Sequence, residues 1–243
     1  MTQLDVEIPR YRPTSDVHPP LDSPAYRSTQ ARRPDRLVQI PQTLSEVTGP
    51  ALGDGVVKPT DADLTAQHDG EPIGERIVVH GQVLEETGKP LRNTLVETWQ
   101  ANACGRYRHG GDRHPAPLDP NFTGAGRCLT DDEGYYRFVT VKPGAYPWGN
   151  HTNAWRPAHI HFSLYGRAFV QRLITQMYFP GDPLFFQDPI FHSVRDEHAR
   201  QRMICDFDLS ETVPEWALAF RFDLVLRGRE ATPMDDPDEQ AHR

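Results

Sequence analysis

The sequence contains no run of about 18 consecutive apolar residues, the length that a helix needs to cross a membrane. Its first residues, MTQLDVEIPRYRP, include acidic side chains where a secretory signal would carry an apolar segment. We therefore expect neither a membrane span nor export, and we predict a cytoplasmic protein.

Cysteine and clustered positive charge are also scarce. The three cysteines, Cys104, Cys128 and Cys205, are widely spaced and form no Cys-x-x-Cys pair, which argues against a disulfide framework and against a thiolate zinc site. The formal net charge is −8, and no basic stretch is dense enough to neutralise a row of phosphates. Nucleic acid is therefore not an expected partner.

Proline, in contrast, is abundant, and its 23 residues favour turns and irregular segments over long helices. Residues 1–70 combine many prolines with little periodicity, which predicts an extended N-terminal arm that packs on the core or on a partner. Residues 71–228 are predicted to form one β-sandwich domain. Residues 229–243 are predicted to be a polar C-terminal tail.

From Gly74 onward, short runs rich in β-branched and aromatic residues alternate with turns. This spacing predicts an all-β fold with a two-sheet β-sandwich core and little helix. The one longer helix expected is Asp196–Ile204. The expected strands are Arg76–Leu84, Leu95–Gln100, Tyr135–Val141, Ala158–Leu164, Leu173–Phe179 and Trp216–Arg227.

The strongest local signal for chemistry is the pair His159 and His161. Residues two apart on a strand point to the same face, about 7 Å apart along the chain, so two imidazoles can converge on one metal. A His-x-His pattern can also be two polar positions on a solvent-exposed strand face that bind no metal. No carboxylate or cysteine lies in the twelve residues that follow His161 (FSLYGRAFVQRL). Tyr107 and Tyr146, in the loops GRYR and PGAYPW, are the other candidate ligands, although a single tyrosine more often serves packing.

Several longer segments resemble the intradiol ring-cleavage dioxygenases, and within that family the branch that acts on protocatechuate. The resemblance covers roughly residues 39–190 and continues in FRFDLVLRG at 220–228. It rests on the segments IPQTLSEVTGP, PIGERIVVHGQV, NTLVETWQANACGRYRH, LDPNFTGAGRCLTDDEGYYRF, KPGAYPWGN, WRPAHIHF and LITQMYFPGDPL.

This resemblance implies one Fe(III) per chain, held by Tyr107, Tyr146, His159 and His161. The residue types suit the ion, because a nearby cation favours ionised phenol and two phenolates with one hydroxide neutralise a trivalent charge. Tyr146 is expected to leave the metal when a catechol binds and to accept one of its protons.

The resemblance also implies roles for residues around the metal. Arg156 is expected to stabilise negative charge that grows on the ring, although a surface ion pair is the plain alternative. Gln176 is expected close to the iron. Trp148 and Ile190 are expected to line the substrate pocket, or else to be ordinary core residues. Tyr26, in the arm, is expected to reach the aromatic acid.

The implied reaction converts protocatechuate (3,4-dihydroxybenzoate) and O₂ into 3-carboxy-cis,cis-muconate. The implied partner is a homologous α subunit that shares each active site, in a higher oligomer of heterodimers. A catechol or hydroxyquinol 1,2-dioxygenase is the alternative within the family, but those enzymes carry a helical N-terminal domain that the Pro-rich arm does not resemble. Outside the family, residues 81–141 alone also resemble metal-free β-sandwich binding modules.

Overall fold

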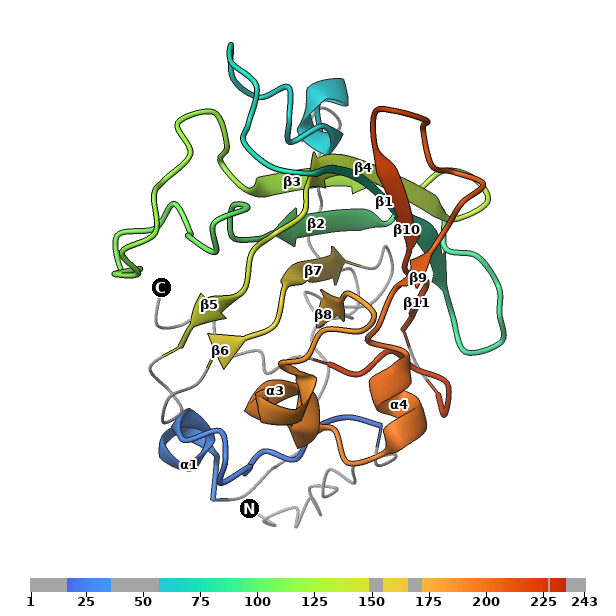
Figure 1. The fold of residues 1–243 in the computed structure, drawn as a ribbon. Coiled ribbons are helices and arrows are strands. Elements are labelled where there is room, and N and C mark those ends of the chain that lie inside the picture. Colours follow the sequence, from blue (N-terminus) through green and yellow to red (C-terminus); the bar gives the residue numbers. More distant parts are fainter. Residues whose placement is uncertain (1–16, 36–56, 149–154, 166–171, 227, 235–243) are drawn as a thin grey trace, which may run out of the picture.

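The computed structural model describes residues 17–35, 57–148, 155–165, 172–226 and 228–234 (Figure 1). Within these ranges the helices are short: α1 (Ser28–Arg32), α3 (Pro189–Ser193) and α4 (Glu197–Gln201), with 3-10 turns η1 (Pro59–Ala62) and η2 (Phe185–Gln187). None of them has the length and apolar character of a membrane-crossing helix. The strands are β1 (Arg76–Leu84), β2 (Leu95–Trp99), β3 (Ala125–Leu129), β4 (Tyr135–Val141), β5 (Tyr146–Pro147), β6 (Trp155–Arg156), β7 (His159–Tyr165), β8 (Arg172–Tyr178), β9 (Asp206–Phe207), β10 (Leu218–Arg221) and β11 (Leu224–Val225).

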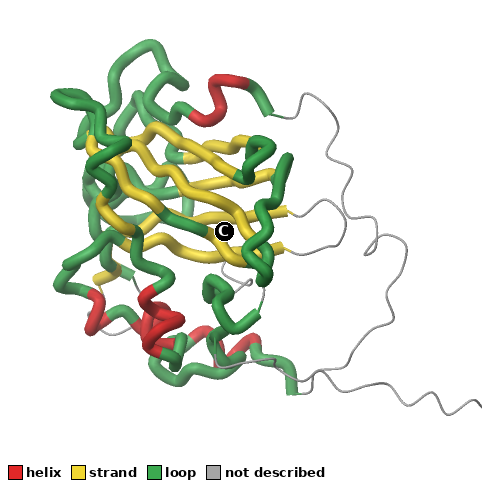
Figure 2. The backbone as a smooth tube through the Cα atoms, turned by 90° about the vertical axis from the view of Figure 1, so that its right-hand side faces the viewer, coloured by secondary structure: helices red, strands yellow, loops and turns green. Residues whose placement is uncertain are grey.

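The strands form two main sheets and one small ribbon. In the first sheet, β1 pairs antiparallel with β4 on one side, and parallel with β10 and then β11 on the other, while β9 extends the sheet beyond β10. The second sheet has the order β3-β2-β7-β8 and is antiparallel throughout. The ribbon joins β5 and β6. Figure 2 shows the strands stacked side by side, with most of the helices gathered at one end.

The core lies between the two sheets. In β7, Ile160, Phe162 and Leu164 are at most 1% exposed and belong to the main apolar cluster, to which β1, β4, β8 and β10 also contribute. Aromatic side chains connect the layers: the ring of Phe162 lies 5.4 Å from that of Phe222 and 6.3 Å from that of Phe138. Because side chains alternate along a strand, this arrangement turns His159 and His161 to the opposite face.

A second apolar cluster covers that opposite face near the start of β7, where α3 and α4 lie (Figure 1). Each of these helices has an aspartate at its N-cap: Asp188 accepts from the backbone N–H of Ile190 at 3.1 Å, and Asp196 from that of Ala199 at 2.7 Å. Helices of five residues are marginal by propensity, so packing holds them in place. The cluster consists of Val17, Tyr178, Phe191, Val194, Ala199, Met203 and Ala231.

The predicted all-β sandwich is confirmed, and two predicted strands, Arg76–Leu84 and Tyr135–Val141, are confirmed at both ends. The prediction of one strand over Trp216–Arg227 is wrong, because β10 ends at Arg221 and β11 begins at Leu224. Between them, the N–H of Phe222 donates to the carbonyl of His80 at 2.8 Å, and the backbone N–H of Gln82 donates to the Asp223 carboxylate at 2.9 Å. These bonds interrupt the regular ladder at the point where its pairing passes from β10 to β11.

Other boundaries also differ from the expectations. The sequence missed β3, because AGRCL has only one apolar residue of any size and no β-branched residue. The helix predicted at Asp196–Ile204 is shorter than expected, since α4 ends at Gln201. Leu64, inside the predicted arm, is fully buried in the main cluster, and its N–H donates to the carbonyl of Val139 at 2.8 Å. The division into arm, domain and tail stays a prediction.

Two buried thiols give the first testable prediction. Burial raises the pKa of Cys128 and of Cys205 from 9.0 to about 12, so the folded state keeps protons that the unfolded chain releases. Stability should therefore be fully present below pH 9 and should fall between pH 9 and 12, by about 1 kcal/mol per pH unit for each thiol. Denaturant unfolding across this range should show a shallower loss for Cys128→Ala than for the unmodified chain. Cys104→Ala, which removes an exposed thiol, is the matched control; equal slopes for all three chains would contradict the prediction.

Candidate metal centre

The candidate site lies on the face of the second sheet that points away from the main core. The alternation of β7 places His159 and His161 together on that face. The register with β8 sets Tyr178 opposite His159 and Gln176 opposite His161. These four side chains are at most 2% exposed, so the sheet presents a buried polar surface at this point.

The small ribbon brings two further side chains to the same place. Tyr146 in β5 is directly opposite Arg156 in β6, and their exposures are 8% and 0%. Only two residues separate Arg156 from the start of β7, and its Nη1 lies 3.2 Å from Nε2 of His159. The same Nη1 lies 3.5 Å from the hydroxyl of Tyr146. The ribbon therefore joins one tyrosine and one cation to the histidine pair.

The two loops that carry the tyrosines touch each other backbone to backbone. The N–H of Gly144 donates to the carbonyl of Asn102 at 3.0 Å. A Cβ on Gly144 would lie 2.5 Å from the carbonyl oxygen of Ala103, and a Cβ on Gly105, whose φ is +74°, would lie 2.1 Å from that of Ala145. Only glycine fits at these two positions. Each tyrosine follows such a glycine by two residues, so this contact sets the spacing between the phenols.

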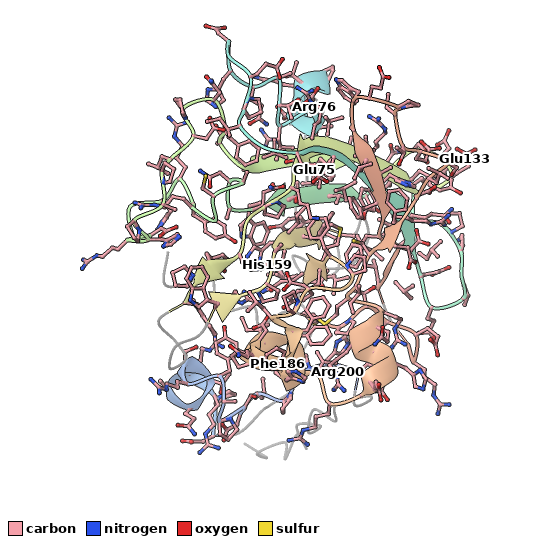
Figure 3. All side chains as sticks on the ribbon, viewed as in Figure 1. Glu75, Arg76, Glu133, His159, Phe186 and Arg200 are labelled. Atoms are coloured by element: carbon pink, nitrogen blue, oxygen red, sulfur yellow. The ribbon has the colours of Figure 1, made fainter. Side chains whose placement is uncertain are left out.

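The four predicted ligands gather in one cluster. The hydroxyl of Tyr146 lies 3.3 Å from Nε2 of His159, and the hydroxyl of Tyr107 lies 3.2 Å from Nε2 of His161. The two imidazole centroids are 4.9 Å apart, and the two phenol centroids are 5.3 Å apart. Figure 3 shows His159 inside the molecule at the start of β7, on the side that faces η2 and α3.

Local contacts turn both imidazoles toward the phenols. Nδ1 of His159 lies 2.8 Å from the carbonyl of Pro157, which assigns the Nδ1 proton to that bond and leaves Nε2 with its lone pair toward Tyr146. The ring of Trp99, opposite His161 in the β2–β7 ladder, stacks on the His161 imidazole at 4.7 Å with 5° between the planes. This stacking fixes the plane of the second imidazole.

The donor set fits a hard metal ion. Two imidazole nitrogens and two phenol oxygens meet in one cluster, buried except for the half-buried Tyr107, and phenolate oxygen favours a hard cation of high charge. In the described part of the chain, no group of three or more His, Cys, Asp or Glu side chains is arranged to hold a metal. The four predicted ligands form a nitrogen and oxygen donor set that could hold a metal ion between the strand β7 and the two tyrosine loops.

Beside the ligands is a buried polar network centred on Arg156. Its Nη2 donates to Gln176 at 2.6 Å, to the hydroxyl of Tyr178 at 2.9 Å and to Asp188 at 2.9 Å, while its Nε donates to the other oxygen of Asp188 at 3.3 Å. The side chains of Arg156 and Asp188 are both 0% exposed. Arg156 is therefore a buried cation with a carboxylate partner, and the alternative of a surface ion pair does not apply.

The predicted substrate-binding residues Trp148, Tyr26 and Ile190 lie around this network. The guanidinium of Arg156 lies 5.5 Å from the ring centroid of Trp148, and the rings of Tyr26 and Trp148 are in edge-type contact with their centroids 5.1 Å apart. Arg32 in turn lies over Tyr26 at 4.8 Å. Ile190 is buried on α3, two residues after Asp188. The structure thus joins Trp148 to Arg156 directly, Tyr26 through Trp148, and Ile190 through the helix that Asp188 caps.

Sequence reasoning missed four residues that contact the predicted ones. Tyr178 could have been found from strand alternation, because it is two residues after Gln176. Asp188 could have been found as a helix N-cap, because it precedes a proline. Trp99 and Asp112 carry no such signal. Trp99 meets His161 through strand pairing, and Asp112 accepts from the backbone N–H of Tyr107 at 2.8 Å.

Comparison with known proteins shows which family shares this sequence and fold. A family model described as "Dioxygenase" matches residues 47–228, and one described as "Protocatechuate 3,4-dioxygenase beta subunit N terminal" matches residues 11–43. This chain belongs to the intradiol ring-cleavage dioxygenase family. It is 59% identical to the protocatechuate 3,4-dioxygenase beta chain of Burkholderia cepacia over 221 residues, which are 90% of this chain and 94% of the relative.

Two further intradiol dioxygenases are less similar to this chain. The protocatechuate 3,4-dioxygenase alpha chain of Pseudomonas putida is 27% identical over 209 residues, which are 81% of this chain and 97% of that one. Among solved structures, a hydroxyquinol 1,2-dioxygenase from Pseudomonas putida DLL-E4 superimposes with a TM-score of 0.54 at 21% identity, covering 78% of this chain and 65% of that one. That structure shows the intradiol dioxygenase fold and nothing finer.

The contact between the tyrosine loops gives the second prediction. Gly144→Ala should push the loops apart, because its Cβ would meet backbone rather than a movable side chain. We expect ferric iron to bind about tenfold more weakly or worse, equivalent to about 1.4 kcal/mol, as measured by chelator competition. Gly110→Ala is the matched control, since a Cβ there meets nothing within 4 Å in the same loop region. Iron affinity that is equal in both variants would refute the role of the loop contact.

Proposed function

We propose that this chain is the iron-bearing, β-type subunit of a protocatechuate 3,4-dioxygenase, with Fe(III) held by Tyr107, Tyr146, His159 and His161. The observation that carries the proposal is that two phenol hydroxyls lie within 3.3 Å of two imidazole Nε2 atoms in one cluster, in which Tyr107 is half-buried and the other three side chains are buried. The close relative of 59% identity, a protocatechuate 3,4-dioxygenase beta chain, supports the substrate class.

The bound metal would supply a centre that a catechol dianion can chelate and toward which the ring can release electron density, so that the ring becomes reactive toward O₂. The overall reaction balances without another reactant, because both oxygen atoms of O₂ enter the product, 3-carboxy-cis,cis-muconate. The remaining tasks belong to the protein: removing one proton from the catechol, while the hydroxide that completes the charge balance would take the other, holding the ring and stabilising the charge that develops on it.

Tyr146 is the group that we assign to proton removal. Its hydroxyl lies next to His159 at 3.3 Å and next to Nη1 of Arg156 at 3.5 Å. As a phenolate it would accept a catechol proton, and the resulting phenol could stay where it is, because Arg156 is its partner across the β5–β6 ribbon. Tyr146 would thus stay in a defined place after it is no longer a ligand.

Arg156 and Gln176 would act on the substrate ring from a fixed frame. The guanidinium is buried and cannot be screened by water, so its positive charge is strong at the place where ring charge grows. Trp148 lies beside that guanidinium and Tyr26 lies beside Trp148, so the two rings would offer an aromatic wall for a planar substrate. Ile190 would add apolar surface from α3.

The wider assembly is part of the same proposal. We propose a homologous α subunit as the partner that completes each active site, in a higher oligomer of such pairs and in the cytoplasm. The alpha-chain relative, which matches 81% of this chain, supports a partner of the same fold. We also propose that residues 1–70 form an arm, residues 71–228 the catalytic domain and residues 229–243 a tail. The match of residues 11–43 to a beta-subunit N-terminal family supports the arm.

An assay tests the substrate. The full chain, co-expressed with an α-type subunit, should consume protocatechuate and O₂ in equal amounts and release 3-carboxy-cis,cis-muconate, identified by mass and ultraviolet spectrum. Catechol and hydroxyquinol are the comparison substrates, because both are substrates elsewhere in the family. A higher kcat/KM for either of these would reassign the substrate. Cleavage beside the two hydroxyl-bearing carbons, rather than between them, would reject the mechanism.

Colour tests the phenolate ligands. The iron-loaded chain should be red-brown from phenolate-to-iron charge transfer, and Tyr107→Phe and Tyr146→Phe should each weaken and shift this band, because each removes one phenolate. Tyr135→Phe is the matched control, since that tyrosine is exposed on β4. An iron-replete sample without colour, or a band that neither ligand variant changes, would remove the tyrosines from the ligand set.

A further inference from the structure

Asp188 is a buried carboxylate that lies outside the proposed ligand set. Its side chain is 0% exposed and accepts four hydrogen bonds from side chains or backbone. Its partners are Nε of Arg156 at 3.3 Å, Nη2 of Arg156 at 2.9 Å, the hydroxyl of Tyr178 at 3.0 Å and the backbone N–H of Ile190 at 3.1 Å. One residue therefore meets the cation, the β8 strand and helix α3.

The geometry of the ion pair decides where the guanidinium points. Nε and Nη2 of Arg156 bond to the two oxygens of Asp188, a two-point contact that fixes the plane of the guanidinium. The remaining nitrogen, Nη1, is then turned toward the ligand cluster, 3.2 Å from Nε2 of His159 and 3.5 Å from the hydroxyl of Tyr146. A single-point contact would allow the group to rotate.

The Asp188 carboxylate also balances the positive charge of Arg156. A buried guanidinium without a counter-charge is strongly unfavourable, and a second cation beside it would make it worse. In the proposed site, two phenolates and a hydroxide balance the ferric ion, so Arg156 needs an anion of its own. Asp188 supplies one on the side of the guanidinium opposite the ligands.

We propose that Asp188 is a positioning residue, which balances the charge of Arg156 and aims its Nη1 at the metal centre while it anchors the helix that carries Ile190. The consequence for catalysis rests on the proposed function. The pairing with Arg156 does not, and it can be measured without iron or substrate.

A double-mutant cycle on the iron-free full chain tests the pairing. Asp188→Asn removes the charge but keeps a side chain that caps α3 as well as aspartate does. It should lower the Tm by roughly 10 °C, because it leaves Arg156 buried with no counter-charge. Adding Arg156→Gln to Asp188→Asn should recover at least half of this loss. Asp196→Asn, the same change at the N-cap of α4, should shift the Tm by less than about 2 °C.

Several outcomes would overturn the proposal. A double variant as unstable as the sum of the two single variants would show that Asp188 acts without Arg156. The same conclusion follows if neither Asp188→Asn nor the double variant folds while Arg156→Gln does. If Asp188→Asn alone fails to fold but the double variant folds, the pairing is supported.

A second readout tests the link to the metal centre. The charge-transfer band of iron-loaded Asp188→Asn should shift in the same direction as that of Arg156→Gln, and its kcat should fall while KM changes by less than about threefold. Asp196→Asn should match the unmodified chain in both. If the double-mutant cycle supports the pairing but neither the unmodified chain nor any variant binds iron, the proposed function fails and the pairing of Asp188 with Arg156 stands. If the unmodified chain is active and Asp188→Asn keeps full kcat and an unshifted band, the positioning role fails.

Discussion

The arrangement of the site depends on the register between β7 and β8. One face of this pair supplies Ile160, Phe162 and Leu164 to the core, and the other carries His159 and His161. A slip of one residue would exchange the faces and place both imidazoles between the sheets. The apolar core therefore determines the ligand positions, because only one register buries the large side chains. The same register sets Gln176 and Tyr178 opposite the two histidines.

A buried polar site of this size must satisfy its own charges. Four of its side chains are 0% exposed and are connected by hydrogen bonds: Arg156, Gln176, Tyr178 and Asp188. Such groups cost stability when one partner is missing but little when every partner is present. The apolar cluster of α3 and α4 keeps water away from this network, since Tyr178 packs its ring in that cluster and gives its hydroxyl to Asp188. Tyr178 therefore belongs both to the apolar cluster, through its ring, and to the polar network, through its hydroxyl.

Local patterns in the sequence predicted the fold and the pairing of His159 with His161, whereas the two tyrosines joined the candidate ligand set only through the family resemblance. Alternation placed His159 and His161 on one face, and short runs with recurring turns gave the sandwich. These patterns could not predict contacts that strand pairing creates between distant segments. Trp99 stacks on His161 only because β2 pairs with β7 in one register. Asp188 reaches Arg156 across 32 positions of sequence, so its helix-cap signal pointed to a local role only.

The four candidate ligands differ in how firmly the backbone holds them, and this difference matches the roles proposed for them. His159 and His161 belong to a seven-residue strand that is paired with β8 along its whole length, and His161 is paired with β2 as well. Tyr146 belongs to a two-residue strand whose ladder partner, in the part of the chain that the structure describes, is the equally short β6. A ligand that must leave the metal is better placed on the shorter element, where a small rotation disturbs few backbone bonds. Arg156, directly opposite and itself bonded to Asp188, would then give the departing phenol a hydrogen-bond partner within the site.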